Sequence, residues 1–156
     1  MSTSPTRLRL GHLATLTFLV LGALLSSPVS AQQAPARAMA TTGQTVWVIV
    51  NRVKADKRAQ FERFVNEIFW PSAAKVGATD QNAFRHTRVL NPTKPSPDGT
   101  YAYLFIMDPV QKGVSYDIEG LLKKAFGNEK AAEYNKLFTE SLAGEQITYV
   151  STQSKY

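Results

Sequence analysis

The sequence predicts an α+β domain in which the elements follow in the order strand, helix, strand, strand, helix, strand. Two segments, 45–54 and 100–108, are rich in β-branched and aromatic residues, which favour strands. Other segments carry apolar residues at steps of three and four, which is typical of helices with one buried face. The chain of 156 residues has no cysteine, so its apolar core, and not disulfides, must stabilise the domain.

The first 31 residues have the three parts of a cleavable signal peptide. Arg7 and Arg9 precede an apolar run from Leu13 to Leu25, and small residues lead up to Ala31. This run is shorter than the roughly 18 to 20 apolar residues that a membrane-spanning helix needs. We therefore expect an exported protein, periplasmic or extracellular, that is cleaved near Ala31 and has no membrane segment in its mature form.

Residues 32–44 are rich in Ala, Gln, Thr and Pro without an apolar period, which predicts a flexible lead-in to a single domain over residues 45–156. A second small-x-small site, formed by Ala38, Met39 and Ala40, leaves the exact cleavage bond open. The first strand is expected over residues 45–54, because Val46 to Val50 are all β-branched or aromatic.

A helix with one apolar face follows the first strand. The face is formed by Phe61, Phe64, Val65 and Ile68. Counted at about 100° per residue, Trp70 falls opposite this stripe. Pro71 disfavours helical geometry at the residue before it and lacks a backbone donor. We therefore expect the helix to kink or end at Trp70, with Gly77 as a stop for anything that continues.

Two strands and a long connection are expected next. Residues 84–90 alternate in a strand-like way, and residues 100–108 do so more clearly, with Tyr101, Tyr103 and Phe105 on one face. The connection contains three prolines and is too long for a two-residue hairpin turn. Such a loop is typical of a disordered segment or a functional lid.

The last part of the chain predicts a second helical region and a final strand. Apolar residues recur at helical spacing from Ile118 to Phe126, and Gly127 and Asn128 then interrupt the pattern. A further stripe extends to Leu142. Residues 146–152 alternate as a last strand.

The order βαββαβ is that of the ferredoxin-like arrangement, an antiparallel sheet with helices on one face. A sheet covered on one side normally alternates apolar with polar residues, but segments 45–54 and 100–108 are apolar on both faces. A monomer would therefore expose an unusually large apolar area. A second subunit laid sheet to sheet would cover it with about 800 Å² per partner, so we expect a homodimer.

This element order, together with a first helix that contains Phe61, Phe64, Ile68, Trp70 and Pro71, resembles the dimeric α+β barrel superfamily. The resemblance covers about residues 45–152. It includes antibiotic biosynthesis monooxygenase-like, NIPSNAP-like and stress-responsive barrel domains. Because the superfamily contains cofactor-free oxygenases, haem-degrading enzymes, isomerases and members without known activity, the resemblance implies a fold and a dimer but no single reaction.

Two residues are candidates for catalysis, His86 and Tyr103. His86 is the one histidine that remains after cleavage, and a lone histidine suits a general base or a haem ligand. On the expected strand 84–90 it shares a face with Phe84, Arg88 and Leu90. The alternative, which we favour, is a histidine that is satisfied by a neighbour at the sheet surface or the dimer seam.

The candidate ligand-binding residues could line a pocket between the sheet and the helices, where an aromatic molecule would stack. They are Trp47, Asn51, Trp70, Tyr101 and Phe105. Asn51 resembles the asparagine with which haem-degrading relatives orient a ligand, but the second helical region here has no histidine, which argues against haem degradation. The alternatives are plain core packing for the aromatic residues and strand-end capping for Asn51.

Several function classes are disfavoured. Lys and Arg outnumber Asp and Glu by 18 to 12, but the charges are interspersed, which indicates a solvated surface and no nucleic-acid partner. Without cysteine there is no thiolate nucleophile or sulfur metal ligand. We find no nucleophile elbow, phosphate loop, zinc-protease motif or EF-hand spacing, so we expect neither a metal nor a cofactor.

Two hypotheses remain. In the first, which we favour, an exported domain binds a small apolar or aromatic molecule between its sheet and helices without catalysis. In the second, the domain is a cofactor-independent monooxygenase-like enzyme, in which the pocket positions an aromatic substrate and His86 or Tyr103 assists proton transfer.

Overall fold

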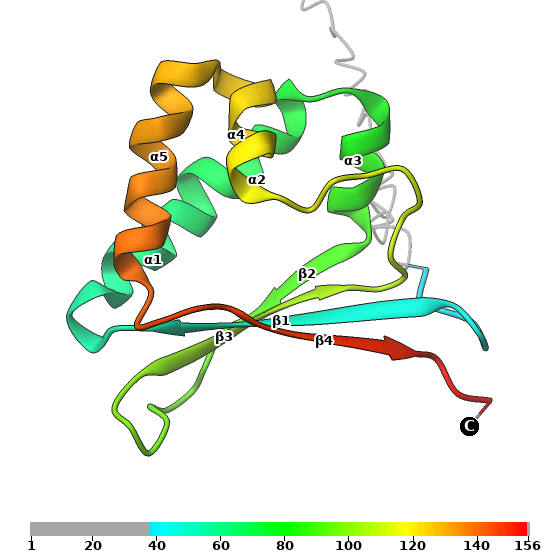
Figure 1. The fold of residues 1–156 in the computed structure, drawn as a ribbon, viewed down its shortest axis with the longest axis horizontal. Helices are drawn as coiled ribbons and strands as arrows, with labels where there is room; N and C mark the ends of the chain where they lie inside the picture. Colours follow the sequence, from blue (N-terminus) through cyan, green and yellow to red (C-terminus); the bar gives the residue numbers. More distant parts are fainter. Residues whose placement is uncertain (1–37, 156) are drawn as a thin grey trace, which may run out of the picture. The chain divides into compact units, whose positions relative to one another are not determined.

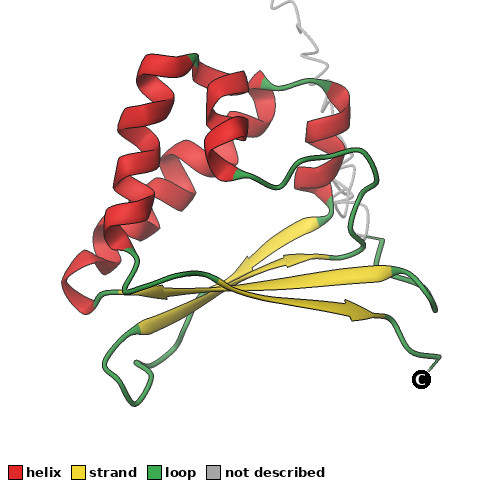
Figure 2. Ribbon diagram, in the orientation of Figure 1, coloured by secondary structure: helices red, strands yellow, loops and turns green. Residues whose placement is uncertain are grey.

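The computed structural model describes residues 38–155, and the expected α+β architecture is confirmed. Four strands form one antiparallel sheet in the order β2-β3-β1-β4, which is the ferredoxin-like order. All the labelled helices lie on one side of this sheet (Figures 1 and 2). The predicted signal peptide, residues 1–31, and the start of the predicted lead-in lie outside the described residues.

Three of the four strands agree closely with the sequence prediction, and the second is shorter than expected. They are β1 (Thr45–Val53), β2 (Thr87–Leu90), β3 (Tyr101–Met107) and β4 (Ile147–Thr152). β1 lies at the centre of the sheet and pairs antiparallel with both β3 and β4. The connection between β2 and β3 forms no helix or strand, as the three prolines predict.

The first helical segment continues past the point at which the sequence predicts its end. It runs through a 3₁₀ turn η1 (Ala55–Lys57), α1 (Arg58–Arg63), a π-helical stretch η2 (Phe64–Phe69), α2 (Trp70–Ser72) and a 3₁₀ turn η3 (Ala73–Lys75). Pro71 lies two residues after the end of the π-helical stretch, in which N–H(i)→O(i−5) bonds replace the N–H(i)→O(i−4) bonds of an α-helix. The chain stays helical past Pro71, to Lys75.

The π-helical stretch also changes the position of Trp70. The expectation that Trp70 lies opposite the buried stripe assumed a regular α-helix, and it is wrong. Each residue of a π turn advances the rotation by less than 100°, so Phe69 and Trp70 follow Ile68 onto the core side. The Trp70 ring lies 5.0 Å from that of Phe69 and 6.0 Å from that of Phe84.

The expected strand 84–90 is largely wrong, because residues 78–85 form a helix, α3 (Ala78–Arg85), and only Thr87–Leu90 are a strand. In a helix the neighbours Ala83 and Phe84 both face the core, and both are buried. Alternation over so short a segment does not distinguish a strand from a helix. The Phe84 ring packs against the Phe69 ring, 5.0 Å away, and this tertiary contact favours the helical conformation of residues 78–85.

Two further helices complete the layer, as predicted. They are α4 (Ile118–Phe126) and α5 (Asn128–Ser141), and Gly127 separates them with a positive φ of 79°. The Asp117 side chain caps α4 by accepting a hydrogen bond of 2.6 Å from the backbone of Gly120. This cap fixes the loop between β3 and α4 against the start of the helix.

An aromatic cluster fills the space between the sheet and the helices. The Phe61 ring lies 4.6 Å from Tyr103 and 5.9 Å from Phe138, and Phe64 lies 5.2 Å from Phe138. Leu122 is also fully buried. The core therefore joins β3 to α1, η2, α4 and α5.

The other side of the sheet, which we call the open face, is apolar. Tyr103 and Phe105 are buried against the helices, and residues paired with them on neighbouring strands face the same way. Because side chains alternate along a strand, the residues on either side of these in sequence face the open side. Two rows cross the open face from β2 to β4: Arg88, Ile106, Val48 and Tyr149, then Leu90, Leu104, Val50 and Ile147. Seven of these eight residues are apolar, which confirms that the central strands are apolar on both faces.

Among the residues that the structure describes, no helix is both long enough and apolar enough to cross a bilayer.

Candidate functional site

A cavity of about 260 Å³ lies between the sheet and the helices. Its floor is the helix-facing side of the sheet, with Ile49 of β1, Thr87 of β2 and Phe105 and Met107 of β3. Helices α3, α4 and α5 and the loop before α4 supply the walls. The cavity therefore lies where sequence analysis expects a pocket.

The deep part of the cavity is aromatic. Its rings come from η2, α3, β3 and α5: Phe69, Phe84, Phe105 and Phe138. Phe69 lies 5.0 Å from Phe84 and 5.4 Å from Phe105 at tilted or edge-on angles. Such a set of rings can take a flat apolar molecule by stacking and edge contacts.

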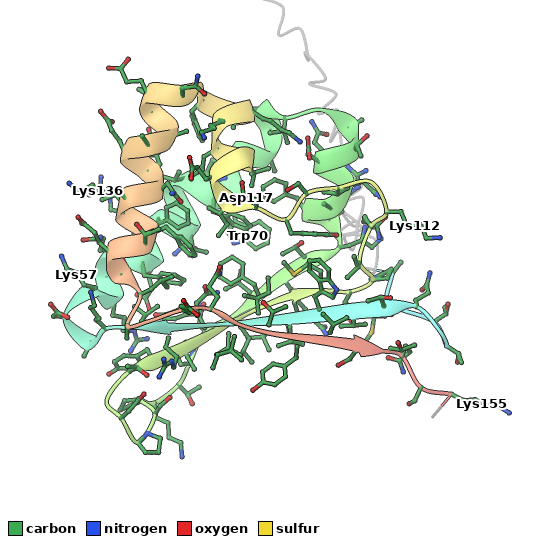
Figure 3. The ribbon with its side chains drawn as sticks, viewed as in Figure 1. Lys57, Trp70, Lys112, Asp117, Lys136 and Lys155 are labelled. Carbon is green, nitrogen blue, oxygen red and sulfur yellow. The ribbon has the colours of Figure 1, made fainter. Side chains whose placement is uncertain are left out.

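The rim of the cavity is polar and is built mainly by the loop before α4 and the start of that helix. It includes Ser115, Tyr116, Asp117 and Glu119. The Tyr116 hydroxyl accepts a hydrogen bond of 2.9 Å from the backbone of Gln111, and burial raises the pKa of this phenol. Figure 3 labels Asp117, which lies in the helical part of the molecule at the start of α4.

Two buried donors without partners lie beside the cavity on β1. Trp47 Nε1 and Asn51 Nδ2 both lack a hydrogen-bond acceptor, and they flank Ile49, whose side chain lines the floor. Asn51 is fully buried, and its Oδ1 accepts 2.7 Å from Gln146, which lines the cavity. An unsatisfied buried donor costs about 1–3 kcal/mol, but neither Trp47 nor Asn51 is among the described residues that line the cavity.

Of the five predicted ligand-binding residues, one lines this cavity, two contact lining residues and two lie elsewhere. Phe105 lines it directly. The ring of Trp47 lies 5.5 Å from that of Tyr116, a lining residue. Asn51 reaches the cavity through Gln146, as described above. Tyr101 lies elsewhere, under the guanidinium of Arg58 at 4.4 Å.

Trp70 lies at a different hollow. With Ala73, Ala74, Gln81, Phe84 and Arg85 it lines a shallow, open depression between α2 and α3. Phe84 lines both this depression and the cavity. The Trp70 ring is therefore separated from the cavity by the rings of Phe69 and Phe84.

Tyr103 is buried in a polar cluster away from the cavity lining. Its hydroxyl donates to Glu62 Oε1 at 2.5 Å and accepts from Arg58 Nε at 3.2 Å. Burial and the Glu62 carboxylate raise the pKa of Tyr103 to about 12. The same hydrogen bonds, first from Tyr103 and then from Arg58, lower the pKa of Glu62. The hydrogen bond to Glu62 also raises the pKa of the Arg58 guanidinium. Arg58, Glu62 and Tyr103 therefore form one hydrogen-bonded unit with paired charges.

His86 lies at the end of α3 and not within a strand. Its Nδ1 lies 2.9 Å from the backbone oxygen of Asn82, and its own backbone oxygen accepts 2.8 Å from Asp108 N. The expected shared face with Phe84, Arg88 and Leu90 does not exist, because Phe84 and His86 lie outside strand β2; only Arg88 and Leu90 share a face. His86 is not among the described residues that line the cavity.

Some lining residues were missed by sequence analysis. Phe84 was assigned to a strand, and Ala83 and the loop residues Tyr116 and Asp117 were given no binding role. The available signal was the Asp117-x-x-Gly120 spacing, which predicts a capped helix start, and the aromatic residue before it. No group of three or more potential metal ligands occurs within residues 38–155.

No protein-family model and no curated protein matches the chain. Two similar solved structures are both named as candidate antibiotic biosynthesis monooxygenases. The structure from Caulobacter crescentus CB15 has 18% identity and a TM-score of 0.38, and the match covers 72% of this chain and 91% of that one. The structure from Nitrosomonas europaea has 11% identity and a TM-score of 0.39, with 72% and 92% covered. This is the group of proteins that the sequence resemblance indicates; similarity at this level transfers no site residue and no activity.

Proposed function

We propose that this domain binds a small, largely apolar or aromatic molecule in the cavity between its sheet and helices. The observation that carries the proposal is the cavity itself, about 260 Å³ in volume, with four phenylalanine rings inside and a polar rim. A dry cavity of about 150 Å³ is enough to hold benzene, so this one has room for a two-ring molecule.

The geometry supports binding better than the oxygenase alternative. Proton transfer needs a donor or acceptor within hydrogen-bond reach of the reacting group. His86 and Tyr103 are both absent from the described cavity lining, and the Tyr103 hydroxyl is already bonded to Glu62 and Arg58. A pKa of about 12 also makes Tyr103 a poor base near neutral pH.

A cavity-filling variant tests the proposal. Ala83 is buried and lines the cavity, so Ala83→Leu places an isobutyl group into the ligand space. We expect it to weaken binding of naphthylmethanol at least tenfold, measured by calorimetry or by tryptophan fluorescence. Ala78→Leu is the matched control, because it makes the same change on an exposed position of the same helix.

Equal affinity of both variants and the unaltered protein would contradict this assignment. Far-ultraviolet circular dichroism and the melting temperature show whether Ala83→Leu is folded. Because the added group enters existing space, we expect less than the roughly 1–3 kcal/mol that overpacking a filled core costs.

We also propose that the protein is a homodimer joined through the open face. Three of its residues are well exposed, namely Leu90, Ile147 and Tyr149 at 46%, 41% and 56%. Charged pairs lie at two corners of this face, Arg52 with Asp98 at 3.6 Å and Arg88 with Asp108 at 3.1 Å. An apolar centre with a polar rim is the usual anatomy of a protein interface.

Finally, we propose that the protein is exported and that residues 1–31 are removed. The support is the charged, apolar and small-residue pattern of the sequence. Intact mass measurement of the protein recovered from the periplasm or the medium tests it. A mass that corresponds to the full chain, recovered from the cytoplasm alone, would contradict it.

A further inference from the structure

The charge of the cavity lining is one-sided. Among the described residues that line it, Asp80, Asp117 and Glu119 carry carboxylates, and none is Lys, Arg or His. All three lie on the helical side, on α3 and around the start of α4, opposite the apolar floor of the sheet. An apolar cavity with carboxylates at one end is polarised toward positively charged ligands.

Two of these carboxylates are paired with lysines that are not among the lining residues. Lys123 Nζ lies 2.6 Å from Glu119, and Lys124 Nζ lies 2.9 Å from Asp80. The side chains of Lys123 and Glu119 are each 47% exposed. Exposed pairs of this kind contribute little free energy, so Glu119 can exchange its lysine partner for a cationic group of a ligand at small cost.

Asp117 is in no ion pair with any residue in the part of the chain described. One of its oxygens, Oδ2, accepts from the backbone of Gly120 at 2.6 Å. A free helix start would attract an anion, but here the Asp117 carboxylate already occupies the start of α4. The start of α4 therefore does not favour an anionic ligand.

The aromatic walls act in the same direction. A cation over the face of an aromatic ring is attracted by the ring quadrupole. Lys75 already makes such a contact with Phe126 of α4, at 4.2 Å, outside the cavity lining. The rings of Phe69, Phe84 and Phe138 offer similar faces within the cavity.

We propose that the cavity selects an aromatic or apolar ligand that carries a positively charged amine, with the amine at the Asp117 and Glu119 end and the apolar body against the sheet. This inference rests on the proposed binding function and adds the charge of the ligand. It excludes aromatic carboxylates as the preferred class. Glu119 and Asp117 act here as specificity-determining residues, and Asp80 contributes from α3.

Three probes of one shape test the proposal: naphthylmethylamine, naphthylmethanol and naphthoate, titrated into the full-length folded protein at neutral pH and low salt. We expect the amine to bind about tenfold more tightly than the alcohol, a ratio that corresponds to about 1.4 kcal/mol. The carboxylate should bind more weakly than the alcohol. Added salt should reduce the preference for the amine, because part of the rim is exposed to solvent.

The variants should move this preference in both directions. Glu119→Gln should reduce the ratio of amine to alcohol affinity at least threefold. Asp117→Asn should do the same, and its side chain can still cap the helix. Lys123→Gln frees Glu119 and should raise it. Glu140→Gln is the matched control, because it breaks the corresponding surface pair with Lys136, whose atoms lie 3.7 Å apart, at a residue outside the lining.

The outcomes separate the two proposals. Binding of all three probes with equal affinity, or tightest binding of the carboxylate, overturns the charge preference and leaves the cavity as a binding site. A preference that Glu119→Gln and Glu140→Gln reduce equally also overturns it. If none of the probes binds, the proposed function fails as well.

Discussion

Tyr103→Phe removes one oxygen from the buried cluster with Glu62 and Arg58, and its effect on stability can be worked out from the structure. The hydroxyl is engaged on both sides, by Glu62 at 2.5 Å and by Arg58 at 3.2 Å. Hydrogen bonds to charged groups contribute about 1.5–3 kcal/mol. Glu62 and Arg58 keep their own contact of 2.9 Å, and their side chains are 37% exposed, so water can replace the lost oxygen. We therefore expect a loss at neutral pH near the lower limit, about 1.5–2 kcal/mol.

The same substitution should change the response to alkali. In the unfolded chain the Tyr103 phenol ionises near pH 10, and in the folded protein its pKa is about 12. Between these values the unfolded state releases the proton first, so the unaltered protein loses stability as the pH rises. Two pKa units correspond to about 2.7 kcal/mol. The advantage of the unaltered protein over Tyr103→Phe should therefore disappear by about pH 12.

Urea unfolding followed by tryptophan fluorescence, at pH 7 and at steps between pH 10 and pH 12, measures this difference. Glu62→Gln with and without Tyr103→Phe completes a double-mutant cycle, in which we expect a coupling of about 1 kcal/mol between contacting residues. A difference in unfolding free energy that stays constant from pH 7 to pH 12 would refute the assignment of a raised pKa to a phenol held by Glu62.

Three other predictions concern the sheet, the turn and the core. Leu104→Arg, at the centre of the open face, should convert the proposed dimer to a monomer in light scattering. Val150→Arg should not, because Val150 is an exposed residue of an edge strand and faces the other side of the sheet. A monomeric unaltered protein would contradict the proposed dimer. Gly127→Ala should lower the free energy of unfolding in urea by about 1–2 kcal/mol, because the residue has a φ of 79°. No atom lies within 4 Å of an added Cβ at Gly127 or at Gly77, but Gly77 has a φ of −68°, so Gly77→Ala should leave the free energy of unfolding unchanged. Equal losses in the two variants would contradict a conformational cause. Leu122→Ala should cost about 2–5 kcal/mol, since the side chain is fully buried, and a loss below 1 kcal/mol in the same assay would show that the core is misplaced.

The sheet was predictable because its strands carry an unambiguous signal. Thr45–Val53 and Tyr101–Met107 are branched and aromatic along their whole length, and Gly127 separates two helical stripes without ambiguity. These local preferences agree with the tertiary structure. The pairing order then follows from the few topologies that four strands and two helical regions allow.

The first helical segment and α3 could not be predicted by counting residues. The rotation of Trp70 depends on a π-helical stretch, and nothing in the composition of residues 64–69 requires one. Residues 78–85 are helical because Phe84 packs between η2 and the sheet, a contact made by residues distant in sequence. Long-range packing overrides weak local alternation at such places.

The candidate site was predictable only where its residues belong to the clearly patterned strands. Phe105 was identified as an aromatic residue of a strand, and the structure places it on the helix-facing side of the sheet, which Trp47 and Asn51 share on β1. The acidic rim was not identified, because Asp80 on α3 and Asp117 and Glu119 at the start of α4 meet only once the helical layer has formed. His86 was assigned to the wrong element, so its expected neighbours were wrong as well.

The central claim, that the cavity between the sheet and the helices is the binding site, is tested most directly by NMR titration of isotope-labelled protein with naphthylmethanol. The titration compares two apolar surfaces of one molecule. The account predicts saturable shifts of Ala83, Met107 and Tyr116, which surround the cavity, and little change at Val48 and Leu104 on the open face. Shifts confined to the open face, with the cavity residues unchanged, would contradict it.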